Sequence, residues 1–166
     1  MNLVVAGHSL IHIRQINFFK EVAHLGHQVT LFCPHRWGEQ RVNSYRQEVD
    51  AGTLEVMALP LEDILEVGGV PSINRFLLRG LPEALAELGL GPEDWVYVQQ
   101  EPESSLAHQV AELPLSCQRA IFTWENVRRP LDHFRYFAAL AKYDLVVCGN
   151  DAAEARLQRA RAQRTI

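Results

Sequence analysis

The opening of the chain alternates a short apolar run, a helical pattern and a second apolar run within about thirty residues. The first run covers residues 2–6 and stops at residues 7–9, Gly-His-Ser. From Arg14 the pattern turns helical, Gly26 ends it, and residues 27–33 form the next apolar run. This order predicts a βαβ unit and hence a parallel sheet, which binds its ligand at the carboxyl ends of the strands. We therefore expect a site where the first strand ends.

The rest of the chain continues the alternation of strands and helices. Further strands are expected at residues 53–59, 94–99, 119–123 and 145–148. Helices are expected at residues 40–50, 73–88 (with a kink or break at Pro82), 105–113, 130–142 and 151–162, and Ser104 or Ser105 caps the third of these. In the helix over residues 130–142 we expect Leu131, Phe134, Phe137 and Ala138 to face inward.

This alternation predicts one Rossmann-like domain over residues 1–166. The fold is a doubly wound parallel sheet of about six strands in a three-layer α/β/α arrangement, with strand order 3-2-1-4-5-6. In that order the first and fourth strands are neighbours, and the chain reverses direction between them. The stretch from Pro60 to Ser72 is expected to be a long connection, which in a compact domain is a functional lid or a disordered segment.

Composition excludes several classes of protein. The apolar fraction of 48% and charged fraction of 22% are ordinary for a globular domain. No run reaches the roughly 18 to 20 apolar residues of a membrane span. A secretory leader would require basic residues near its start, but no Lys or Arg precedes Arg14. Cys33, Cys117 and Cys148 are expected to be reduced thiols, so we predict a cytoplasmic protein.

Charge is distributed unevenly along the chain. Residues 1–117 hold 7 basic and 15 acidic side chains, whereas residues 118–166 hold 9 basic and 5 acidic ones. The basic part is interpreted either as a solvated helix face or as a surface for phosphate or the anionic inner face of a membrane. No nucleic-acid-binding motif accompanies it, so nucleic acid is not expected as a partner.

Two kinds of cofactor site are not predicted. The loop after the first strand has Gly7 but no Gly-x-Gly-x-x-Gly, and no acidic residue ends the second strand, which argues against a nicotinamide dehydrogenase. The seven histidines show no i, i+4 pair with an intervening carboxylate and no accompanying Cys pair, so no metal site is expected.

Several polar and aromatic residues follow strands at the predicted ligand-binding edge. His8 is a hydrogen-bond donor that suits a phosphate or a sugar hydroxyl. Carboxylates such as Glu101 either accept hydrogen bonds from hydroxyls or are solvated side chains at the ends of strands. Trp124 either packs against a sugar or belongs to the core. The candidate substrate-binding residues are His8, Ser9, His35, Arg36, Trp37, Glu101, Glu125 and Asn126. Glu101 is the candidate catalytic residue, because it stands where the strand order reverses.

The ordered motifs resemble glycosyltransferase family 4. The similarity is carried by residues 2–6, by the Phe-Phe-x-x-Val-Ala-x-x-Gly-His-x-Val-Thr-Leu-x-x-Pro run of residues 18–34, and by the Tyr-Asp-Leu-Val-Val-x-x-Asn-x-Ala-Ala run of residues 143–153. Residues 100–102 (Gln-Glu-Pro) and 122–126 (Phe-Thr-x-Glu-Asn) resemble strand ends in one branch of the family. The glycine pair common in the family's first loop is missing here.

The resemblance implies that the chain is the N-terminal, acceptor-side half of a two-domain GT-B enzyme. The full-length enzyme would transfer a sugar from a nucleotide-sugar to a hydroxyl of a sugar or glycolipid-type acceptor, with retention at the anomeric carbon. The donor would bind in the C-terminal domain, no tightly bound cofactor or metal is implied, and the isolated half would be inactive. The alternative is a stand-alone Rossmann-like binding or regulatory domain.

Overall fold

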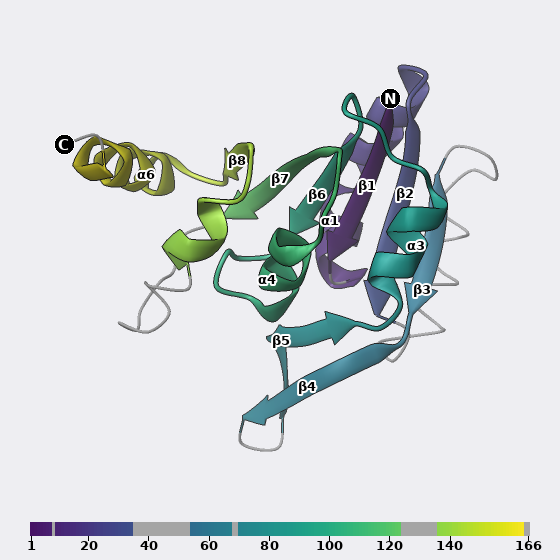
Figure 1. The fold of residues 1–166 in the computed structure, drawn as a ribbon, viewed down its shortest axis with the longest axis horizontal. Helices are drawn as coiled ribbons and strands as arrows, with labels where there is room; N and C mark the ends of the chain where they lie inside the picture. The colour runs from purple at the N-terminus through teal and green to yellow at the C-terminus, as the bar shows by residue number, and fades with distance from the viewer. Residues whose placement is uncertain (8, 35–53, 68–69, 124–135, 165–166) are drawn as a thin grey trace.

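The computed structural model describes residues 1–7, 9–34, 54–67, 70–123 and 136–164 (Figure 1). Its main feature is a six-stranded sheet, with a separate two-stranded sheet below it in the figure. The strands of the main sheet are β1 (Asn2–Gly7), β2 (Gln28–Pro34), β3 (Glu55–Leu59), β6 (Trp95–Gln99), β7 (Gln118–Thr123) and β8 (Leu145–Cys148).

The strand order is β3-β2-β1-β6-β7-β8, and every neighbouring pair is parallel. This is the predicted order, because β6, β7 and β8 are the fourth to sixth strands of the main sheet. The doubly wound α/β prediction is confirmed. The central strands are apolar runs buried on both sides, as expected for a parallel sheet covered by helices.

The first helix, α1 (Ser9–His24), begins five residues before the predicted position at Arg14. The intervening residues are mostly apolar, and a short apolar run fits a strand end and a buried helix equally well. The predicted stop is confirmed. Gly26 adopts a left-handed φ of 88°, and its N–H donates to the carbonyl of Ala23 at 2.9 Å.

The prediction of a long connection at residues 60–72 followed by a helix at 73–88 is wrong. β4 (Leu61–Val67) and β5 (Val70–Leu78) form an antiparallel hairpin that projects away from the main sheet (Figure 1). Gln109 of α4 (Ser105–Glu112) fixes the base of the hairpin, because its side-chain amide donates to the carbonyl of Leu78 and accepts from the N–H of Leu78. The helix α3 (Leu81–Glu87) begins only after the hairpin. Pro82 therefore lies in the first turn, where proline is favoured, rather than at a kink.

The later helices are α4 (Ser105–Glu112), a short helix over residues 136–140, and α6 (Asp151–Arg164). Ser104, of the two candidate caps, is the one that caps α4, and its Oγ accepts from the N–H of Ala107 at 3.1 Å. The inward face expected at Phe137 and Ala138 is wrong by one position, since Tyr136 is buried and those two are half-buried. Leu131 and Phe134 lie outside the described residues, as does the predicted helix at 40–50.

Helices cover both faces of the sheet, which gives three layers. α3, α4 and the 136–140 helix enclose one core cluster, with Phe32, Val98 and Leu106 fully buried. α1 packs on the other face through Ile16 and Phe19. The same face carries an apolar groove of about 510 Å³ over β6, β7 and β8, in which Phe18, Leu145 and Val147 are exposed.

At the amino ends of the strands, which we call the amino edge, polar groups tie neighbouring segments together. The carboxylate of Asp94 accepts from the backbone N–H of Asn2 at 2.5 Å, from its side-chain amide at 3.2 Å, and from the N–H of Gly91 at 2.9 Å. These donors hold the pKa of Asp94 below its usual value of 3.8. Asp144 accepts from the N–H of Arg119 at 2.8 Å in the same manner. The amino edge is therefore cross-linked by charge-assisted hydrogen bonds.

Candidate functional site

The candidate site lies at the opposite side of the sheet, where the strands end, which we call the carboxyl edge. β1 ends at Gly7 and β6 ends at Gln99, and these two residues are paired in register. The chain leaves β1 toward β2 and leaves β6 toward β7, so the strand order reverses between them. In open α/β sheets this reversal is where ligands bind.

A chain of three polar side chains stands at this edge. The hydroxyl of Thr123, at the end of β7, lies 2.8 Å from Oε2 of Glu101 and 3.0 Å from the hydroxyl of Tyr136. A carboxylate only accepts, so Thr123 donates its single proton to Glu101 and accepts from Tyr136. Tyr136 thus donates to Thr123, and Thr123 donates to Glu101. These three hydrogen-bonded side chains connect the loop after β6, the end of β7 and the 136–140 helix.

Burial keeps the hydroxyl of Tyr136 protonated. Burial, with the nearby negative charge of Glu101, raises the pKa of Tyr136 to about 12, although its hydrogen bond with Thr123 opposes the shift. Tyr136 is 1% exposed and Thr123 is fully buried. The phenol therefore stays a donor at ordinary pH, and the Glu101 carboxylate is held in one place as a hydrogen-bond acceptor.

Two buried glutamines directly precede Glu101. Gln99 is fully buried, and Gln100 is 2% exposed. Both polar atoms of the Gln100 side chain, Nε2 and Oε1, are buried and have no hydrogen-bond partner among the described residues. A buried amide normally finds a partner, because an unmade hydrogen bond in a low-dielectric interior is costly.

The structure describes only part of the predicted site. Glu101 lies at the carboxyl edge, half-buried, and Ser9 is the first residue of α1, two positions after the last residue of β1. The remaining candidates lie outside the described residues: His8, His35, Arg36, Trp37, Glu125 and Asn126, together with Trp124. Their roles stay predictions.

Sequence reasoning missed Thr123 and Tyr136. Thr123 was expected at a strand end but has no chemistry that distinguishes it from any strand-terminal threonine. Tyr136 could not be found, because the predicted helix register placed its neighbour inward. Only the approach of the 136–140 helix to the end of β7 brings the two hydroxyls together.

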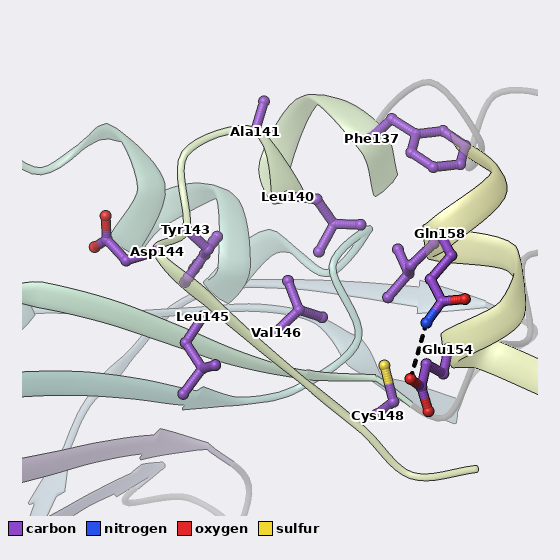
Figure 2. A pocket seen from close by; sticks show the side chains of 11 residues that line it. Phe137, Leu140, Ala141, Tyr143, Asp144, Leu145, Val146, Cys148, Glu154 and Gln158 are labelled. Carbon is purple, nitrogen blue, oxygen red and sulfur yellow. Dashed lines mark hydrogen bonds between the residues drawn. The ribbon is translucent and has the colours of Figure 1, made fainter. Parts of the chain in front are cut away.

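A separate cavity of about 710 Å³ lies along β8, between the 136–140 helix and α6 (Figure 2). Leu140, Val146 and Phe137 give it an apolar wall, while Glu154 and Gln158 of α6 point toward each other and are joined by a 3.0 Å hydrogen bond. The polar groups of this cavity form hydrogen bonds with neighbouring protein atoms. It therefore lacks the convergent polar side chains of the carboxyl edge.

No group of three or more His, Cys, Asp and Glu side chains is placed to hold a metal ion within the described ranges. Cys33, Cys117 and Cys148 form no disulfide with one another, and burial raises the pKa of Cys117 and Cys148. None of the helices in the described part of the chain is long and apolar enough to cross a membrane.

Comparison with known proteins shows the fold. No protein-family model matches the sequence, and no curated protein matches it either. Among solved structures, the chain is similar to UGT89C1 of Arabidopsis thaliana, crystallised in complex with UDP-L-rhamnose, with a TM-score of 0.56 and 14% sequence identity. The match covers 90% of this chain and 44% of that one, so this chain spans less than half the length of the structure it resembles. The Rossmann-like sheet thus corresponds to one half of a GT-B architecture.

Proposed function

We propose that residues 1–166 are the acceptor-side half of a glycosyltransferase. The observation that carries this is the Tyr136–Thr123–Glu101 chain at the strand-order reversal of a sheet whose fold matches part of UGT89C1. A fixed carboxylate suits a hydroxyl-bearing substrate, because it accepts a hydrogen bond from the hydroxyl that reacts. The sequence resemblance to glycosyltransferase family 4 supports the same class of reaction.

In this proposal Glu101 acts on the acceptor hydroxyl, and the surrounding residues hold it in position. Transfer between two bound substrates depends on orientation and on stabilisation of the departing diphosphate. The nucleotide-sugar and its diphosphate belong to a second domain that would follow this one. The family 4 resemblance implies retention at the anomeric carbon. The anomeric configuration of the product, measured by NMR, would distinguish retention from inversion.

The alternative is a binding domain without catalysis, for which the buried six-stranded sheet offers a complete core of its own. The same polar edge would then bind a polyol without transferring a sugar. The sequence that follows residue 166 in the gene distinguishes these functions, because a transferase requires a donor-binding domain.

The test uses the 166-residue chain labelled with ¹⁵N. Titration with methyl glucoside, methyl mannoside and methyl galactoside is expected to shift the backbone amides of Gly7, Glu101 and Thr123 saturably. The amides of Gly91 and Asp144 at the amino edge serve as controls and should not move. A turnover assay with nucleotide-sugars should show no transfer by this chain alone. Robust transfer, or no shift at the carboxyl edge with any glycoside, would overturn the proposal.

A further inference from the structure

Gln100 occupies a position that the fold does not explain. It follows the last residue of β6 directly, beside Glu101, at the strand-order reversal. Its side chain is 2% exposed, yet neither its amide nitrogen nor its amide oxygen has a hydrogen-bond partner in the part of the chain that the structure describes. An apolar side chain of the same size would fill this space without leaving polar atoms unpaired.

The buried hydroxyls near Gln100 have partners, which makes its amide a contrast to them. Thr123 and Tyr136 complete each other's hydrogen bonds, and Ser104 caps α4. At the amino edge, Asp94 receives three hydrogen bonds. Buried polar groups without a hydrogen-bond partner in the fold concentrate at functional sites, where a ligand supplies the missing hydrogen bond.

We propose that Gln100 recognises the acceptor by pairing with two adjacent hydroxyl groups of a sugar ring, toward which its amide turns when the sugar binds. This rests on the proposed function and narrows its substrate to a ring with vicinal hydroxyls. A primary amide carries a donor and an acceptor side by side, and neighbouring hydroxyls offer an acceptor and a donor at matching positions. An alcohol with one hydroxyl satisfies only one of the two groups. The Glu101 carboxylate, held by Thr123, is adjacent in sequence and takes the reacting hydroxyl.

The first measurement concerns the amide in the free protein. Gln100→Met replaces it with an unbranched apolar side chain of similar length. Removal of an unpaired buried amide should raise the midpoint of thermal unfolding, by about 2–4 °C. Gln118→Met, at an exposed position at the start of β7, is the matched control and should leave the midpoint nearly unchanged. A lower midpoint for Gln100→Met would show that the amide is satisfied inside the fold, by a buried water for example, and would overturn the proposal.

The second measurement follows the ligand. In the ¹⁵N-labelled chain, the side-chain amide signals of Gln100 should shift saturably with the methyl glycosides and stay still with cyclohexanol, which has one hydroxyl. Gln100→Met should weaken glycoside binding at least tenfold, whereas Gln118→Met should not. If glycosides shift the amides of Gly7 and Thr123 but not the side chain of Gln100, the proposed function stands and this proposal fails. If no signal at the carboxyl edge moves, both fail.

Discussion

The two edges of the sheet differ in how their polar groups are hydrogen-bonded. At the amino edge, Asp94 receives three hydrogen bonds from Asn2 and Gly91, and Asp144 receives one from Arg119. The bonds from Asn2 and Arg119 join segments that are neighbours in the sheet, whereas the bond from Gly91 closes the turn before β6. At the carboxyl edge, the hydroxyls of Tyr136 and Thr123 form a chain that ends at the Glu101 carboxylate, and the amide of Gln100 has no partner among the described residues.

The difference indicates which edge stabilises the fold and which one is available for chemistry. Charge-assisted hydrogen bonds at the amino edge lower the free energy of the folded state directly. An unpaired amide at the carboxyl edge raises it, which natural proteins tolerate where function requires it. Substitutions at the amino edge should therefore cost stability, and those at the carboxyl edge should alter activity or binding instead.

The largest expected effect is on turnover. Under the proposed glycosyltransferase function, Glu101→Gln in the full-length enzyme should lower turnover by one to three orders of magnitude, about 1.4 to 4 kcal/mol of transition-state stabilisation. The midpoint of thermal unfolding should barely change, because a glutamine oxygen still accepts from Thr123. Glu87→Gln, at an exposed position of α3, is the control and should keep near-normal turnover. Intact turnover, or an unfolded protein, would contradict the assignment of Glu101.

The next effect is on stability at the amino edge. Asp94→Ala leaves the donors of Asn2 and Gly91 without their acceptor, so urea unfolding should show a loss of about 1–3 kcal/mol at neutral pH. The exposed neighbour Glu93 provides the control variant Glu93→Ala, which should lose little.

This loss should also depend on pH. Because the pKa of Asp94 is lowered in the folded state, its contribution is present above the usual pKa of 3.8 and disappears as the pH falls through the lowered folded value. The wild type and Asp94→Ala should therefore converge in stability in acid. A constant difference down to pH 2 would show that the carboxylate charge is not responsible.

The smallest expected effect tests the hydroxyl chain. Tyr136→Phe removes the donor to Thr123 but keeps the ring, so stability should fall by only about 0.5–1.5 kcal/mol. Turnover of the full-length enzyme should fall too, because Glu101 loses part of its support. Tyr143→Phe is the matched control, since its hydroxyl donates to the carbonyl of Ala107 at 2.8 Å, away from Glu101. Equal turnover losses in both variants would place the effect in the core rather than in the site.

The sequence by itself determined the six main strands, their order and several helix ends. These features depend on local patterns: apolar runs of strand length, the left-handed φ at Gly26 and the capping hydroxyl of Ser104. The strand order then follows from short connections and the right-handed crossover of parallel strands. Glu101 could be chosen as the candidate catalytic residue for the same reason, since topology places it at the reversal.

Only the tertiary structure decided the hairpin and the hydrogen bonds of the site. The hairpin of β4 and β5 has its base fixed by Gln109, 31 positions along the chain from Leu78, and residues 73–78 fit a helical pattern when read alone. Tyr136 reaches Thr123 because the 136–140 helix packs with a register that periodicity placed one residue away. The unpaired amide of Gln100 is likewise a property of its surroundings. Hydrogen-bond partners in a folded core come from distant segments, and no local pattern specifies them.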